Sequence, residues 1–319
     1  MENKKIKTSI GGQALMEGIM MRGPKKTAVA LRLPDKSIHV EEYETEFIKD
    51  KYKIFRLPFF RGIGSLIDAL KVGRKAMMLS VEKAIESKDE KEKNQEESNL
   101  EKWLSKKLGK DITKIVIGIG SFFGILVSVF FFLFLPSWIF NNIFKSSSIF
   151  GNVAGRSIFE GIIKFLIFLF YLIGISKMKD IKRIFMYHGA EHKTIFCYEN
   201  REDLTVKNVK KFKRFHPRCG TSFLVLMLIV GIFLGIFIPF TNPIVRSMTK
   251  ILCMPLFVAL GFELIKLCSK YDNFFTRLIA KPGLWMQRIS TKEPNEDMIE
   301  IAIEAIKRVI PENGEDQIK

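Results

Sequence analysis

Four long apolar blocks constrain what this chain of 319 residues can fold into more than any other feature of its sequence. They cover residues 112–135, 157–175, 221–240 and 251–267, and each holds at most two charged side chains. A helix of about 20 apolar residues can cross the hydrocarbon core of a bilayer, and a soluble protein cannot easily bury four such helices. The sequence therefore predicts a mainly α, polytopic membrane protein with about four transmembrane helices.

Basic residues predict how these helices are oriented. Residues 176–220, between the second and third blocks, hold twelve lysines and arginines, whereas the connections on either side hold two each, counting Lys250 at the start of the fourth block. Because such loops remain on the cytoplasmic side, we expect this segment and both termini to be cytoplasmic and the protein to lie in the cell membrane. Attraction of basic flanks to anionic lipid explains most of the formal charge of +17. The lipid bilayer is thus an expected partner. Nucleic acid is not expected as a partner, because the sequence contains no nucleic-acid-binding motif.

The four cysteines do not indicate a disulfide framework. Cys197 and Cys219 fall in the cytoplasmic segment, where thiols stay reduced, and Cys253 and Cys268 lie in or beside the last block. The N-terminus does not resemble a signal peptide, so membrane insertion is expected to rely on the first block.

Four regions follow from this pattern. Residues 1–86 are expected to form a small N-terminal α+β cytoplasmic region, 87–111 a charged linker, 112–270 the membrane region with its cytoplasmic loop 176–220, and 271–319 a C-terminal cytoplasmic helix region.

Within the N-terminal region, alternation predicts a hairpin of strands 27–33 and 38–48 around a Pro-Asp-Lys-Ser turn. Residues 10–24 show no helix or strand period and are expected to form a packed, glycine-rich loop. Apolar residues from Pro58 to Ile85 recur every three or four positions and predict a basic amphipathic helix, which could lie on the membrane surface or pack on the hairpin.

Three local expectations concern the later part of the chain. Glu160 is expected to pair with Lys164, one helical turn away. Lys281-Pro282-Gly283 is expected to break the chain, and a final helix is expected from Asn295 to a point before Pro311.

The strongest chemical signal is His188-x-x-Glu191-His192. On a helix the two histidines project from one face, one turn apart, so both imidazoles can reach one metal ion, zinc being the expected one. The pattern is that of inverted zincins, in which Glu191 would act as general base on a metal-bound water. On an unbroken helix, Glu199 would share this face.

Several residues compete for the third ligand position: Glu199, His216, Cys219 and Glu263. A distant downstream acid favours Glu263, whereas ligand softness favours Cys219 or His216. Two other interpretations stay open, namely a contact with lipid headgroups or a satisfied interfacial cluster without metal, and a different catalytic use such as a cysteine nucleophile.

Longer motifs carry a resemblance. The segments GGQALMEGIMMRGP, Arg61-Gly62, YHGAEHKTIFCYE, HPRCGTSF, the Glu263 region and PGLWMQRISTKEPNEDMIEIAI together resemble the YqhQ-like family of bacterial membrane proteins. That family is of unknown function, with metal-dependent enzyme activity suggested for it. The resemblance implies that motif positions are occupied by Glu17, Arg22, His188, Glu191, His192, Glu199, His216, Arg218 and Cys219. It also makes Gln13, Glu17 and Arg22 candidate site residues that fold up to the histidine segment.

Two functions of different classes follow. The first is a metal-dependent hydrolase that acts at the cytoplasmic membrane face on a peptide or lipid-linked bond. The second is a non-catalytic membrane factor that binds and regulates another membrane protein, such as a protease or translocation component. A transporter is disfavoured, because the expected spans show no broken helices.

Overall fold

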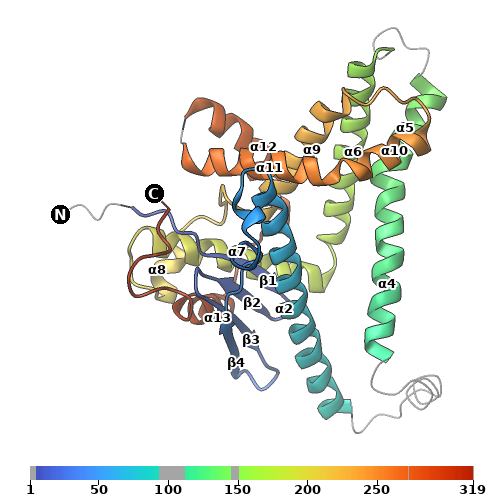
Figure 1. The fold of residues 1–319 in the computed structure, drawn as a ribbon. Coiled ribbons are helices and arrows are strands. Elements are labelled where there is room, and N and C mark those ends of the chain that lie inside the picture. Colours follow the sequence, from blue (N-terminus) through green and yellow to red (C-terminus); the bar gives the residue numbers. More distant parts are fainter. Residues whose placement is uncertain (1–4, 93–111, 145–150, 272, 319) are drawn as a thin grey trace. The chain divides into compact units, whose positions relative to one another are not determined.

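The computed structural model describes residues 5–92, 112–144, 151–271 and 273–318 (Figure 1). The chain forms two compact units. The first comprises Met1–Ser87, Phe170–Val230 and Pro255–Lys319, and the second comprises Lys88–Leu169 and Gly231–Met254. The first unit therefore brings together the N-terminal region, the histidine segment and the C-terminal region, which are far apart in the sequence.

A four-stranded antiparallel sheet organises the first unit. Its strands follow one another in chain order: β1 (Gly11–Leu15), β2 (Gly18–Arg22), β3 (Lys26–Arg32) and β4 (Ile38–Glu44). The predicted hairpin is confirmed as β3 and β4. The expectation of a loop over residues 10–24 is wrong, because this segment forms the hairpin of β1 and β2.

The first hairpin could not be recognised from the sequence because its strands, GGQAL and GIMMR, contain glycines and show no polar–apolar alternation. In β2, Ile19 and Met21 are buried on one face and Met20 on the other, so polar and apolar residues do not alternate. The turn between the strands places Glu17 at a φ of 53°, a left-handed conformation that a non-glycine residue seldom adopts.

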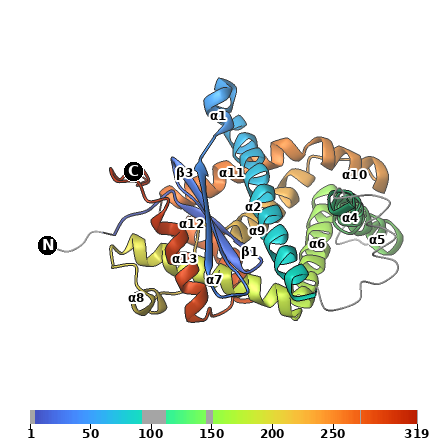
Figure 2. The same cartoon turned by 90° about the horizontal axis from the view of Figure 1, so that it is seen from below.

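Helices cover both faces of this sheet (Figure 2). On one face, Val72, Ala76 and Met77 of α2 (Phe60–Glu92) pack with Met20 and Val29. On the other face, α7 (Lys179–Glu199) and α13 (Glu296–Lys307) enclose the larger core. The short helix α1 (Ile48–Lys51) and a 3₁₀ turn (Lys53–Arg56) connect β4 to α2.

The amphipathic helix predicted from Pro58 is confirmed as α2. Of the two alternatives for its position, the structure shows the one in which it packs on the sheet. It leaves Ile67 and Leu70 exposed, at 41% and 64%. The helix extends to Glu92, into the first part of the expected charged linker. Residues 93–111, the rest of that linker, lie outside the described residues.

Two helices close the C-terminal part. The predicted final helix is confirmed as α13, whose Asn295 cap accepts a hydrogen bond from the backbone of Met298 at 3.0 Å. The predicted break at Pro282 is wrong, because α12 (Phe274–Ser290) runs through it. At Gly283 the helix packs closely on Ser222, since a Cβ there would lie 2.7 Å from Cα of Ser222. Pro282 has no backbone N–H and so removes one helical hydrogen bond.

In the part of the chain that the structure describes, two helices are long and apolar enough to cross a membrane. One covers Gly118–Phe144 and the other is α6 (Val153–Ile175). The first consists of α4 (Ile112–Val129), α5 (Leu135–Ile139) and π-helical turns at Phe130–Phe134 and Phe140–Phe144. These helices account for the first two apolar blocks.

The last two blocks differ from the prediction. The third forms α9 (Gly220–Gly235), which at 1.5 Å per residue is about 24 Å long, less than the roughly 30 Å hydrocarbon core. The fourth forms part of a pair, α10 (Pro243–Leu252) and α11 (Met254–Lys270), which is bent by 55°. The bend precedes Pro255, a residue that disfavours helix just before it. Within the described residues, the structure thus supports two candidate spans, or up to three if the bent pair is one span, of the four expected.

A buried ionic network holds the second unit together. Glu160 on α6 is 2% exposed and accepts hydrogen bonds from Nε of Arg156 at 3.0 Å and Nε of Arg246 at 2.9 Å. Lys250 forms a further ion pair with it. Glu160 was expected to pair with Lys164. In the structure it forms ion pairs with three other cations, Arg156 and, from α10, Arg246 and Lys250.

Candidate metal centre and its surroundings

The histidine motif lies on α7, which is helical without interruption from Lys179 to Glu199. His188 and His192 are therefore one turn apart, as predicted from their spacing, and their ring centroids are 4.4 Å apart. Gly189, which weakens a helix prediction, has a packing role. A Cβ at this position would collide with the carbonyl oxygen of Lys292, so only glycine lets the 292–294 segment pass this closely along the helix.

Three potential metal ligands meet here. Among the residues that the structure describes, His188, His192 and Cys219 form a group whose ligand atoms all lie within 4.8 Å of one another. Nε2 of His188 is 3.1 Å from Sγ of Cys219. His192 and Cys219 are buried, and His188 is half-buried. Of the four candidates for the third ligand position, the structure places Cys219 with the histidine pair.

Main-chain carbonyls orient both imidazoles. Nδ1 of His188 lies 2.9 Å from the carbonyl oxygen of Ser290, and Nδ1 of His192 lies 2.5 Å from that of Arg214. A carbonyl oxygen only accepts hydrogen bonds, so each Nδ1 must carry the proton and donate. In the neutral rings this leaves the Nε2 lone pairs free, which is the arrangement that metal-ligating histidines commonly have.

The loop that carries Cys219 is fixed by α12. The side-chain amide of Gln287 accepts from the backbone N–H of His216 and donates to its carbonyl oxygen, both at 2.7 Å. It also donates to Oγ of Ser222 at 3.0 Å. Neither Gln287 nor Ser290 was predicted as a site residue. Both lie inside the segment PGLWMQRIS, and its place among the motifs of the family resemblance was the one signal that pointed to them.

Glu191 lies at the edge of the sheet. Its Oε1 accepts a hydrogen bond from the backbone N–H of Gly12 in β1 at 3.0 Å, and a Cβ at Gly12 would lie 2.9 Å from its carboxyl carbon. Burial raises the pKa of Glu191, while the charge of His188 and the hydrogen bond from Gly12 oppose this rise. A raised pKa in a buried carboxyl beside potential metal ligands is typical of an acid–base group.

Glu199 and His216 form a second, adjacent cluster and are not part of the three-ligand group. Glu199 accepts from the backbone N–H of Thr8 at 2.8 Å and pairs with Arg218, and its Oε2 is 3.6 Å from Nε2 of His216. Burial alone would raise the pKa of Glu199, but the His216 contact and the Arg218 charge lower it below its ordinary value. Burial lowers the pKa of His216 to about 4, so this imidazole is neutral at neutral pH.

Glu263 is used elsewhere. On α11 it accepts a hydrogen bond from Nε of Arg61 at 2.6 Å and another from the backbone N–H of Phe59 at 3.3 Å. The structure therefore does not bring Glu263 to the histidine pair. Its partner Arg61 belongs to the Arg61-Gly62 motif of the resemblance.

The N-terminal candidates reach α7 in part. Oε1 of Glu17 pairs with Nε of Arg183 at 2.5 Å, and the hydroxyl of Tyr187 donates to the same carboxylate at 3.3 Å. Gln13 and Arg22 project instead from the opposite face of the sheet and line a cavity beside α2. Strand β1 contacts α7, and Gly12, rather than Gln13, reaches Glu191.

The role of Gly189 gives a stability prediction. We expect Gly189→Ala to lower the free energy of unfolding by about 1–3 kcal/mol, because the added methyl group must displace the backbone at Lys292. Thermal unfolding of the purified protein in detergent measures the effect. Gly174→Ala is the matched control, since a Cβ there meets nothing within 4 Å and alanine favours a helix by up to about 1 kcal/mol. Equal behaviour of the two variants would contradict this packing role.

Comparison with known proteins places the chain among proteins of unknown function. Residues 57–312 match the family model described as "Protein of unknown function (DUF1385)". A curated relative, the "Uncharacterized protein YqhQ" of Bacillus subtilis (strain 168), is 32% identical over 314 residues, which are 97% of this chain and 95% of the relative. No solved structure matches. The family match and the near full-length identity show that the chain belongs to the DUF1385 family, of which it is a YqhQ-like member.

Proposed function

We propose that His188, His192 and Cys219 bind a divalent metal, zinc in particular, and that the protein is a metal-dependent hydrolase of the cytoplasmic membrane face. One observation carries this proposal. Two imidazoles of α7 and the thiol of Cys219 have their ligand atoms within 4.8 Å of one another. Both imidazoles are oriented by hydrogen bonds from Nδ1 to carbonyl oxygens.

The donor set suits zinc. Imidazole nitrogen and cysteine sulfur are the ligands that zinc prefers, and three protein ligands leave one position of a tetrahedral site open. A zinc ion bound there would supply Lewis acidity and lower the pKa of a water molecule to about 7. The second requirement of hydrolysis, a group that takes up a proton, is met by a neighbour on the same helix.

That neighbour is Glu191, which we propose as the general base. It precedes His192 directly in sequence, and burial raises its pKa above the ordinary value of a carboxyl group, which favours uptake of a proton. Its hydrogen bond from Gly12 holds one carboxylate oxygen and leaves the other for proton transfer.

The substrate is proposed from location. From the charge pattern we infer that the basic segment 176–220 and both termini are cytoplasmic. The apolar helices α6 and α9 directly precede and follow the segment that carries the site. Bonds available there are those of membrane peptides and of lipid-linked molecules. We therefore propose a peptide or lipid-linked bond as the target.

A second function is favoured by one contact. Because Glu191 is buried and bound by the backbone of β1, it could serve to tie the sheet to α7, and the metal could serve to tie α7 to the Cys219 loop. The protein would then be a membrane factor that binds and regulates another membrane protein, such as a protease or translocation component.

Glu191→Gln distinguishes the two functions. Native membrane extract is incubated with the wild-type protein or with the variant, and released peptides and lipid fragments are compared by mass spectrometry. An enzyme is expected to release products that Glu191→Gln fails to release, a loss of at least about 100-fold, although the variant keeps its metal. Glu202→Gln, on the exposed turn after α7, is the matched control. Identical product profiles for wild type and Glu191→Gln would favour the binding factor.

A further inference from the structure

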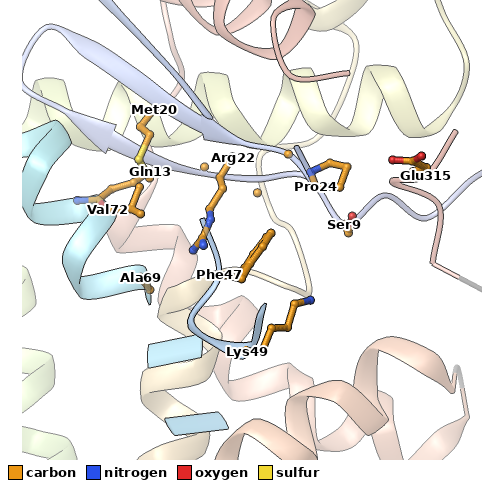
Figure 3. Close-up of a pocket in the computed structure, with 13 residues that line it drawn as sticks. Ser9, Gln13, Met20, Arg22, Pro24, Phe47, Lys49, Ala69, Val72 and Glu315 are labelled. Atoms are coloured by element: carbon orange, nitrogen blue, oxygen red, sulfur yellow. The ribbon is translucent and has the colours of Figure 1, made fainter. Parts of the chain in front are cut away.

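A second site lies on the face of the sheet that carries α2. A cavity of about 570 Å³ opens there, in the size range of small-molecule sites. Figure 3 shows the side chain of Arg22 extending from β2 into this space, with Phe47 between it and Lys49. Gln13 and Ser9 add polar groups to the wall, and Gly11 leaves it open, since a Cβ there would meet nothing within 4 Å.

Arg22 makes few hydrogen bonds for a half-buried cation. Its guanidinium carries five N–H donors, yet among the described residues it makes one hydrogen bond, from Nη2 to the carbonyl oxygen of Glu46 at 3.2 Å. Its Nε is buried and has no partner. Burial lowers the pKa of Arg22, and the charge of Asp68 opposes this fall.

The nearby acids neutralise this wall only in part. Asp68 forms a long ion pair with Arg22, 3.9 Å from Nη2, which is too far for a hydrogen bond, and its carboxylate accepts the backbone N–H of Ile48 at 3.1 Å. Glu315, the one acid that lines the cavity, pairs with Lys25 at 2.8 Å. Lys49 adds a second positive charge at 4.5 Å from the centroid of the Phe47 ring, and Arg22 lies at the same distance from that ring.

We propose that this cavity binds a phosphate group, carried either by a free phosphorylated small molecule or by a lipid headgroup, with Arg22 and Lys49 as its principal ligands. A phosphate offers three terminal oxygens and a charge of about −1.5 to −2. It can therefore engage the fork of an arginine and a separate ammonium at the same time. A single carboxylate has two oxygens and one charge and would leave part of this donor set unused.

The proposed phosphate site does not depend on the proposed metal chemistry. Its residues belong to β1, β2 and the segment from Phe47 to α2, and none is a candidate metal ligand. The two sites share Gly12, which lines the cavity and donates its N–H to Glu191.

Binding measurements test the phosphate site. Binding by the full-length protein is measured in two arms. In the first, the protein in neutral detergent is titrated with inorganic phosphate. In the second, its binding to phosphatidylcholine nanodiscs with phosphatidic acid is compared with its binding to nanodiscs without it. EDTA is present throughout, so that a metal cannot hold the phosphate. We expect Arg22→Gln to weaken binding about tenfold or more, the effect of losing a hydrogen bond from a charged group. The arm that shows this loss identifies the source of the phosphate.

The controls separate this site from the general positive charge. Arg32→Gln is the matched control, because its side chain is 18% exposed, close to the 17% of Arg22, but it does not line the cavity and its ion pair with Glu300 is short, at 2.9 Å. It should bind as the wild type does. Lys49→Gln, at an exposed position, should also weaken binding and serves if Arg22→Gln fails to fold. His192→Ala should bind phosphate normally whatever its metal content. Absence of binding in both arms, or equal binding by the Arg22, Lys49 and Arg32 variants, would overturn the proposal.

Discussion

Purified full-length protein is expected to contain about one equivalent of zinc, and His192→Ala and Cys219→Ser are expected to lose it. Each variant removes one of three ligand atoms that lie within 4.8 Å of one another, and two remaining ligands hold zinc far more weakly than three. Metal content is measured by mass spectrometry after purification in detergent without chelator. His188→Ala should behave in the same way.

The chain offers matched controls for both ligand types. His39→Ala changes the one histidine outside residues 176–220, on β4, where it contacts Glu41 at 3.3 Å. Cys268→Ser changes a free cysteine on α11. Both should keep the full metal content.

Wild-type protein without metal would refute the metal proposal. If Cys219 in that protein were alkylated faster than the other cysteines, the pair of Cys219 and His188 would instead be a nucleophile and its base.

The second large effect is expected in the buried network of the second unit. Glu160→Gln should lower the free energy of unfolding by about 3–5 kcal/mol, because it leaves buried cations without their carboxylate. Arg246 is 0% exposed and Lys250 is 3% exposed, so neither can recover its charge interactions from water without moving. Unfolding in detergent, followed by circular dichroism, measures the change.

Glu312→Gln, on the exposed C-terminal segment, provides the control and should change stability by less than about 0.5 kcal/mol. A comparably small effect of Glu160→Gln would mean that the network is hydrated and does not hold the second unit together. Arg246→Met should be destabilising as well, because this guanidinium also donates to the carbonyl oxygen of Gly235 at 3.1 Å and to Oγ of Ser157 at 2.9 Å.

Periodicity predicted those elements whose sequences carry a regular apolar repeat. The hairpin of β3 and β4, the amphipathic helix α2 and the final helix α13 each show it, and each is present. It could not predict β1 and β2, whose strands GGQAL and GIMMR contain glycines and show no such repeat, nor the continuation of α12 through Pro282, where the helix packs closely on Ser222. Of the four expected spans, the described residues bear out two, or three if the bent pair is one span. Hydropathy measures composition, whereas the break before Pro255 and the end of α9 at Gly235 depend on local geometry.

The candidate site was predictable to the same extent. His188 and His192 are neighbours by helical spacing alone, so the sequence was sufficient for them. The choice among Glu199, His216, Cys219 and Glu263 depends on tertiary contacts. Glu263 pairs with Arg61, about 200 positions away in the chain. Glu199 accepts a hydrogen bond from Thr8 and pairs with Arg218. Residue spacing in the sequence cannot predict partners that are so distant.

The position of α12 determines the geometry of the candidate metal centre at two points. This one helix supplies the carbonyl oxygen of Ser290, which orients His188, and the amide of Gln287, which holds the loop before Cys219. A displacement of α12 by a fraction of an ångström would therefore alter two of the three ligands together. The same helix exposes Phe274, Leu278 and Trp285 at 72%, 51% and 47%. Metal affinity in this protein would thus depend on how firmly α12 is seated and would report any binding event that moves it.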